Sequence, residues 1–270
     1  MKFVFVWVAL LTALLLNTSV LADEGFPGRV KYPKIPVMEL NELYQAKKKV
    51  VIVDTRSQYE YETLRIKGAI NIPIASTSFE DQVLRLREKT DRPIVFYCNG
   101  HRCMKSYLSV KKAQEAKVSN VFAFDAGIFD WTNAYPAESE LLGQSPVRKD
   151  MLIAGKRFKA RLLDPDAFSE SIMRRKHKSM VLDVRDKFQR AGVGFYPGME
   201  RWASLDDRKK INNFIQKAKM ENKTLYIYDE VGKQVRWLQY ALERAGVKDY
   251  YFMEKGARAY YDMLAKLTWK

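Results

Sequence analysis

Two cysteines lie five positions apart in the stretch PIVFYCNGHRCMKS, which runs from Pro93 to Ser106. Cys98 directly follows an apolar run typical of a buried β-strand. In open α/β sheets, ligands bind beyond the carboxyl ends of the strands, where loops lead into helices. Backbone N–H groups and a helix N-terminus can stabilise a thiolate, or an anionic sulfur species attached to it, in such a loop. The position therefore predicts a reactive Cys98 rather than an inert buried one.

The residues between the two cysteines favour the same interpretation. Gly100 permits backbone angles that a residue with a Cβ resists, while His101 and Arg102 bring hydrogen-bond donors and positive charge beside the sulfur. Cys103 has two alternative roles. It is either a second thiol that attacks a persulfide or disulfide on Cys98, or an inert side chain packed against the helix.

Metal and nucleotide chemistry find no support in the sequence. The chain contains two histidines and two cysteines, and their distribution lacks any recognisable metal-ligand spacing. His177 lies in the polar run RRKHKS and suggests no function. Because no phosphate-binding glycine loop or dinucleotide fingerprint occurs, we expect neither a metal nor a nucleotide cofactor.

The first 22 residues have the pattern of a secretory signal. Lys2 precedes the apolar run FVFVWVALLTALLL, and small residues follow up to Ala22. We expect cleavage near Ala22 and a periplasmic or otherwise exported mature chain. In an oxidising compartment structural cysteines usually pair, but a bridge between Cys98 and Cys103 would close a very short loop and stabilise little. Chemistry explains these two residues better than stability does.

The formal net charge of +15 is unevenly distributed. Residues 33–140 contain 16 Lys and Arg against 14 Asp and Glu, whereas residues 151–270 contain 26 against 15. A basic second half could attract an acidic protein partner, an anionic membrane surface or small anions, or it could simply be a solvated surface. Nucleic acid is not expected as a partner, since an exported protein rarely meets it.

Sequence repetition indicates two similar domains. VVIVDTR at 50–56 recurs as SMVLDVR at 179–185, IVFYC at 94–98 as LYIYD at 225–229, and FDAGIFDW at 124–131 as MEKGARAY at 253–260. Three ordered matches at nearly one offset indicate a duplication. The predicted domains are residues 33–140 and 155–270, joined by a polar linker at 141–154 that contains Gly143 and Pro146.

Short apolar runs alternate with amphipathic stretches in each copy, which predicts α/β domains with parallel sheets. In the first copy we expect strands at 50–53, 69–71, 94–97 and 121–124, and helices at 38–45, 79–89, 103–116 and 128–133. In the second copy DDRKKINNFIQKAKM and GKQVRWLQYALERAG are the expected helices, and Gly246 ends the latter.

Both halves resemble the rhodanese-like sulfurtransferase domains. The resemblance in the first half rests on VVIVDTRSQYEYETLRIKGAINIP, on the loop from Cys98 to Cys103, and on FDAGIFDW, which together cover most of residues 33–136. It implies a three-layer α/β/α domain in which a loop cysteine takes sulfur from a small anionic donor such as thiosulfate. The resulting persulfide, the one covalent intermediate, would pass its sulfur to cyanide or a thiol.

The resemblance assigns roles to individual residues. It implies that Cys98 is the nucleophile and that Asn99, Gly100, His101, Arg102 and Cys103 complete the loop around the sulfur. Asp54 and Arg56 match the family's Asp-x-Arg after the first core strand and would support the active-site side of the sheet. Met104 stands where related phosphatases carry the arginine that grips phosphate, which argues against phosphate hydrolysis.

The second copy carries Asp229 at the position of Cys98. A carboxylate cannot form a persulfide, so we expect this copy to be catalytically silent. Three hypotheses follow for the whole chain. In the first, it is an exported sulfurtransferase that needs Cys98 more than Cys103. In the second, it is a thiol redox or persulfide-carrier protein that needs both cysteines and docks an acidic partner through the basic second domain. In the third, it is a non-enzymatic adaptor in which Cys98 is inert.

Overall fold

The computed structural model describes residues 25–268. The predicted signal at residues 1–22 therefore lies outside the described residues. None of the helices within 25–268 is long and apolar enough to cross a membrane. The chain divides into two compact units between Val147 and Arg148, a point inside the stretch 141–154 for which a linker is predicted.

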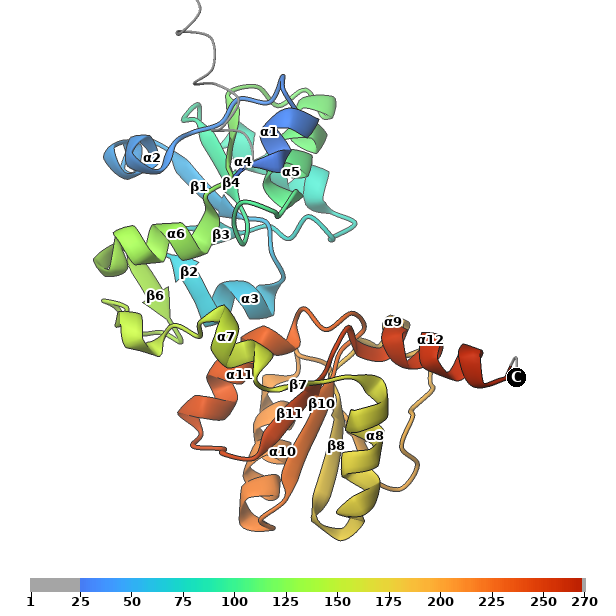
Figure 1. Ribbon diagram of the computed structural model, residues 1–270. Coiled ribbons are helices and arrows are strands. Elements are labelled where there is room, and N and C mark those ends of the chain that lie inside the picture. The colour runs from blue at the N-terminus through green and yellow to red at the C-terminus, as the bar shows by residue number, and fades with distance from the viewer. Residues whose placement is uncertain (1–24, 269–270) are drawn as a thin grey trace, which may run out of the picture. The chain divides into compact units, whose positions relative to one another are not determined.

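Unit 1 contains a four-stranded sheet in which all neighbouring strands are parallel (Figure 1). Its order is β3 (Ile70–Asn71), β1 (Val51–Asp54), β4 (Ile94–Tyr97) and β5 (Val121–Phe124). The four strands coincide with the predicted runs to within a residue. A fully buried parallel strand requires apolar side chains on both faces, and the burial of all four residues of β1 and β4 meets that requirement.

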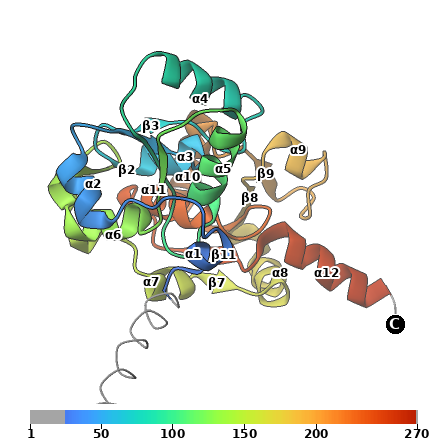
Figure 2. The same cartoon turned by 90° about the horizontal axis from the view of Figure 1, so that it is seen from above.

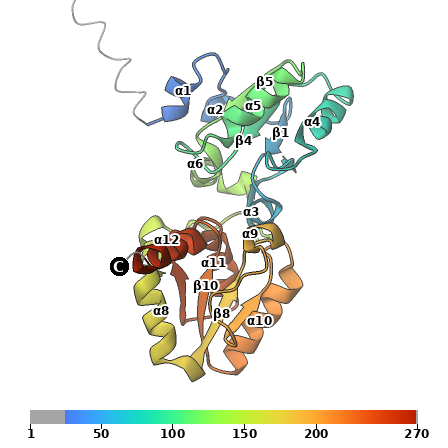
Figure 3. The same ribbon diagram turned by 90° about the vertical axis from the view of Figure 1, so that its right-hand side faces the viewer.

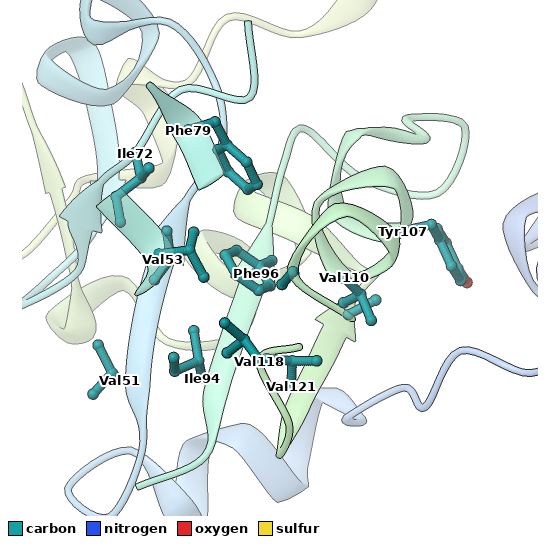
Figure 4. Close-up of a cluster of buried hydrophobic side chains, with 13 residues drawn as sticks. Val51, Val53, Ile72, Phe79, Ile94, Phe96, Tyr107, Val110, Val118 and Val121 are labelled. Atoms are coloured by element: carbon teal, nitrogen blue, oxygen red, sulfur yellow. The ribbon is translucent and has the colours of Figure 1, made fainter. Parts of the chain in front are cut away.

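Helices cover both faces of this sheet, as the views in Figures 1 and 2 agree. The helices α4 (Phe79–Glu88) and α5 (Lys105–Glu115) lie on one face, while α2 (Leu40–Ala46) and α6 (Gly127–Ala134) lie on the other. Figure 4 shows the core between the sheet and the first pair. In it Phe79 of α4 and Val110 of α5 pack with Val53, Phe96 and Val121 of the strands.

Unit 1 also has elements that no sequence pattern predicted. They are α1 (Pro27–Lys31), α3 (Gln58–Thr63), the 3₁₀ turn Pro136–Glu138, and an antiparallel pair formed by β2 (Leu64–Ile66) and β6 (Ser139–Leu141). These elements are short, so hydrophobic periodicity cannot detect them. Helix α3 forms because Ser57 and Glu60 make a reciprocal capping box at its N-terminus.

Unit 2 contains a five-stranded parallel sheet with the order β7, β11, β10, β8, β9. Figure 3 shows α8 and α10 on opposite sides of this sheet. The strands are β7 (Leu162–Leu163), β8 (Ser179–Asp183), β9 (Glu200–Trp202), β10 (Thr224–Tyr228) and β11 (Tyr250–Met253). The helices are α7 (Gly155–Lys159), α8 (Pro165–Arg174), α9 (Lys187–Arg190), α10 (Arg208–Met220), α11 (Val235–Arg244) and α12 (Gly256–Thr268), with 3₁₀ turns at Lys149–Met151 and Lys176–Lys178.

The two sheets share a strand order. Strands β3, β1, β4 and β5 of unit 1 occupy the same places in their sheet as β9, β8, β10 and β11 in theirs. An isolated parallel bridge between Val37 and Ala123 lies beside β5, where unit 2 has β7 beside β11. The predicted α/β class with parallel sheets is confirmed. Both predicted helices of the second half are present as α10 and α11, and Gly246 follows α11 with φ +71°.

Candidate functional site

Cys98 lies at the carboxyl end of β4, where the sequence predicts it, but its side chain is fully buried. Its thiol donates a hydrogen bond to the carbonyl oxygen of Cys103 at 3.2 Å and lies 3.8 Å from Ser106 Oγ. Burial raises the pKa of Cys98 well above the ordinary thiol value, because removal from water disfavours the charged form. Burial therefore disfavours the thiolate form of Cys98.

Cys103 has the opposite environment. It is partly exposed and lies two residues before the first residue of α5, so the helix N-terminus adds partial positive charge at its sulfur. A hydrogen bond from the Cys98 side chain is the main cause that lowers the pKa of Cys103 to about 6, and it outweighs burial. Backbone N–H groups of Lys105 and Asn99 and the charge of Lys105 act in the same direction. The environment therefore favours the thiolate form at Cys103 more than at Cys98.

The loop between the cysteines depends on one close backbone contact. Gly100 has φ +144°, and Gly127 at the start of α6 packs directly against it. A Cβ on Gly127 would lie 2.6 Å from the Cα of Gly100, a distance that real Cβ atoms do not show. Gly127 also has φ +67°, in the left-handed region that favours glycine. The glycine at 127 thus sets the path of the cysteine loop.

Asp54 and Arg56 form a fully buried ion pair at the same end of the sheet. Arg56 Nη2 lies 2.6 Å from Asp54 Oδ2 and 2.5 Å from the Leu64 carbonyl oxygen, and Nη1 donates to Asn99 Oδ1 at 3.2 Å. Asn99 in turn donates to Glu60 Oε1 at 3.1 Å. This chain of contacts ties the Asp-x-Arg pair to the residue that follows Cys98.

Glu60 is a buried carboxylate close to the loop. Burial opposes its ionisation, but Arg56, Lys105 and the hydrogen bond from Asn99 outweigh that effect and lower its pKa. Lys105 Nζ lies 3.8 Å from Glu60 Oε2. The site therefore contains a fixed negative charge that partly neutralises the cations around Cys103.

His101 and Arg102 differ in how they are held. His101 Nε2 lies 2.7 Å from Asp130 Oδ2 of α6, and the imidazole ring packs on the Phe26 ring with centroids 4.1 Å apart. Arg102 is exposed to solvent. All six predicted loop residues, 98–103, thus lie together at one end of the sheet, close to the buried ion pair of Asp54 and Arg56.

Sequence reasoning missed several residues that contact the loop, namely Phe26, Glu60, Lys105, Ser106 and Asp130. A Ser-x-x-Glu pattern marks Glu60 as a helix-capping residue and so conceals its second role at Asn99. Phe26 and Asp130 come from segments remote in sequence, so no local pattern could reveal them. No group of three or more His, Cys, Asp or Glu side chains within residues 25–268 is arranged to hold a metal ion.

Unit 2 has a loop of similar construction after β10. Asp229 is buried, and its two carboxylate oxygens accept hydrogen bonds from the backbone N–H groups of Val231, Gly232, Gln234 and Val235. Burial raises the pKa of Asp229, although the four amides oppose the shift. The protein's own carboxylate therefore fills this amide cradle.

The surroundings of Asp229 repeat those of the cysteine loop. Arg185 and Asp183 form a fully buried ion pair 2.8 Å apart, and the Arg185 guanidinium lies 4.0 Å from Glu230, as Arg56 contacts Asn99 in unit 1. A Cβ on Gly256 would lie 2.7 Å from the backbone N of Gly232, as Gly127 meets Gly100.

The family model of the rhodanese-like domain matches residues 37–134. A tRNA uridine(34) hydroxylase of Bdellovibrio bacteriovorus is 32% identical over 100 residues, which cover 36% of this chain and 28% of that protein. An HTH-type transcriptional regulator of Mycobacterium tuberculosis, Rv0324, is 41% identical over 83 residues, which cover 30% of this chain and 34% of the regulator.

Among solved structures, the thiosulfate sulfurtransferase of Pseudomonas aeruginosa aligns over 87% of this chain and 46% of its own, with 22% identity and a TM-score of 0.35. Each of these relatives is matched over less than two thirds of its own length. The family match instead spans the four strands of unit 1, the cysteine loop and the Asp-x-Arg pair. Residues 37–134 therefore form a rhodanese-like domain.

Proposed function

We propose that the rhodanese-like domain transfers sulfane sulfur from a small anionic donor, such as thiosulfate, to cyanide or a thiol through a cysteine persulfide. The observation that carries the proposal is a pair of cysteines in the loop between β4 and α5, where Cys103 is partly exposed, lies two residues before the helix N-terminus and has a lowered pKa. A thiolate is the form that attacks sulfur. The covalent persulfide is the only cofactor-like group that this chemistry requires.

Burial and charge favour Cys103 over Cys98 as the nucleophile, the reverse of the sequence assignment. Cys103 is partly exposed and its pKa is lowered, whereas Cys98 is buried and its pKa is raised. In the proposed step the Cys103 thiolate attacks the outer sulfur of thiosulfate, the sulfur–sulfur bond of the donor breaks, and sulfite leaves with its electron pair. The acceptor then attacks the terminal sulfur of the persulfide and regenerates the Cys103 thiolate.

Charge near Cys103 suits a small anion. Lys105 at the start of α5 and the exposed Arg102 supply positive charge, and the backbone N–H groups of Asn99 and Lys105 can hold the negative sulfur. Glu60 lies close to Lys105 and limits the net positive charge. We infer a preference for compact donors that reach the thiolate between these side chains.

Two serine variants test the proposal. The chain is incubated with thiosulfate, and the site of any added sulfur is mapped by mass spectrometry while thiocyanate formation from cyanide is followed. We expect Cys103→Ser to lose both the adduct and the activity, and Cys98→Ser to keep the adduct on Cys103. If the wild-type chain acquires no sulfur on either cysteine, sulfur transfer is refuted. If only Cys98→Ser abolishes the adduct, Cys98 is the nucleophile.

A second candidate function is that of a thiol redox or persulfide-carrier protein. The hydrogen bond of 3.2 Å from the Cys98 thiol to the Cys103 carbonyl oxygen favours it, since it holds a candidate resolving thiol beside the nucleophile's residue. Attack of Cys98 on the inner sulfur of a Cys103 persulfide would form a Cys98–Cys103 disulfide and release hydrogen sulfide. Sulfide release in a single turnover, lost in Cys98→Ser, distinguishes this function from transfer to an added acceptor.

For unit 2 we propose a second rhodanese-like copy without catalysis. Its support is the shared strand order and the Asp229 carboxylate that occupies the amide cradle. We propose in addition that the chain is exported after cleavage near Ala22 and that the basic second half recruits an acidic partner. Replacement of Asp229 by Ala should leave the activity of unit 1 unchanged. A loss of activity as large as that of Cys103→Ser would contradict a silent second copy.

A further inference from the structure

Unit 1 contains a groove of about 1030 Å³ far from the cysteine loop. Its lining includes Val50, Val51 and Ile52 at the beginning of β1, and Arg92, which lies just before β4. Cys98 follows the other end of β4. The groove and the cysteine loop therefore lie at opposite ends of the parallel sheet and can bind different molecules.

The groove is strongly basic. One acidic side chain lines it, Glu138, which forms an ion pair with Lys47. Against this single carboxylate stand five cationic side chains, namely Lys47, Lys48, Lys49, Lys67 and Arg92. A concave surface lined by one sign of charge concentrates counter-charged ligands and speeds their association.

A short part of the β1 edge also lies in the groove. Strand β1 pairs with the edge strand β3 only through Val53–Ile70 and Asp54–Asn71, whereas its pairing with β4 covers all four of its residues. Val51 donates its N–H to the Pro93 carbonyl oxygen on the β4 side, so within the described chain Ile52 is the position of β1 that faces the β3 side without a paired residue, and it is buried. The edge therefore offers an added extended segment one position for backbone pairing.

Exposed apolar side chains lie beside this edge. Ile70 of β3 is 38% exposed and Tyr44 of α2 is 45% exposed, and both line the groove. The Tyr44 ring stacks on Tyr135 at a centroid separation of 4.0 Å, which fixes its position. These side chains provide apolar contact area next to the cations.

We propose that this groove binds an extended acidic peptide segment of a protein partner. The cations would pair with its carboxylates, Ile52 of β1 would bond its backbone, and Ile70 and Tyr44 would contact its apolar side chains. A peptide fits these features better than a membrane surface, because a concave groove is inaccessible to a flat bilayer. The proposal is independent of sulfur transfer.

The probe is a fluorescein-labelled peptide in which Glu alternates with Val, and its anisotropy is measured with the full chain at low and high salt. We expect saturable binding that weakens as salt rises. A peptide of equal charge with Pro in place of Val cannot pair as a strand and should bind at least about threefold more weakly, given the net contribution of a backbone hydrogen bond.

A charge-reversal triple variant tests the location. Lys48→Glu, Lys49→Glu and Arg92→Glu together should weaken peptide binding by about tenfold or more, because three exposed attractions become repulsions. All three positions are exposed, so folding should be retained and can be checked by thermal unfolding.

The matched control carries the same change in net charge outside the groove, through Lys34→Glu, Lys89→Glu and Lys111→Glu, all of which are exposed. It should bind nearly as well as the wild-type chain. Equal losses in both triple variants would mean diffuse electrostatic attraction and would overturn the proposal. Binding to anionic lipid vesicles without binding to the peptide would overturn it as well. The proposal would also be overturned if the peptide does not bind and the groove variant self-associates. In that case the lysines would only protect the strand edge from pairing with other copies of the chain.

Discussion

The two thiols differ most in how they should react as pH changes. Cys103 has a pKa of about 6 against an ordinary thiol value of 9.0, so its thiolate fraction at pH 7 is about 90% rather than about 1%. A thiolate of lower pKa is intrinsically less nucleophilic, by roughly 15- to 30-fold for such a shift at a Brønsted slope of 0.4–0.5. The net gain in rate at pH 7 is then only about three- to sixfold. The position of the pH midpoint is therefore the more decisive measurement.

The assay follows alkylation of the wild-type chain by iodoacetamide between pH 4.5 and 9, with each cysteine quantified separately by peptide mass spectrometry. Modification of Cys103 should rise through a midpoint near pH 6 and reach a plateau by pH 7.5. Cys98, buried and protonated, should remain unmodified until the chain is denatured. A midpoint above pH 8 for Cys103, or faster alkylation of Cys98 than of Cys103, would refute the assignment of the thiolate.

Three further predictions concern the supports of the loop. Cys98→Ala removes the side chain that is the main cause of the low pKa of Cys103, so the alkylation midpoint of Cys103 should move to higher pH. An unchanged midpoint would mean that the helix N-terminus lowers the pKa of Cys103 instead. Gly127→Ala should lower the free energy of unfolding in urea by more than Gly68→Ala does. Both glycines have positive φ, but only Gly127 has backbone atoms within 3 Å of the new Cβ. Equal losses in the two variants would show that the close contact at Gly127 is relaxed easily. Arg56→Ala strands a buried carboxylate and should cost about 3–5 kcal/mol in the same measurement, and a loss below 1 kcal/mol would mean that the pair is not truly buried.

Local patterns were sufficient for most of the fold. Continuous apolar runs such as Ile94–Tyr97 are buried on both faces of a parallel sheet, and this burial makes them recognisable without knowledge of their neighbours. The loop from Cys98 to Cys103 was likewise predictable as a site, because a strand end, a glycine and basic residues occur within six positions. By contrast, α3 and the β2–β6 pair are too short to leave a periodic signal.

The roles that we propose for the two cysteines differ from those that the sequence predicts. They depend on which sulfur lies nearer to solvent and which lies close to the N–H groups of Asn99 and Lys105, and spacing alone does not fix either. The contact between Phe26 and His101 is equally invisible, since it joins segments 75 residues apart that only the folded chain brings together. Three-dimensional burial thus decides between chemically identical side chains.

The Asp229 loop shows that a loop can have the shape of such a site without carrying a group that can react. Four main-chain donors already converge on one point in unit 2, and a covalently attached anion satisfies all of them. A visiting oxyanion would have to compete with this tethered ligand, whose effective concentration is high, so we expect the cradle to bind free anions weakly. Such a loop can act as a receptor for anions only where no side chain of the protein already satisfies its main-chain donors.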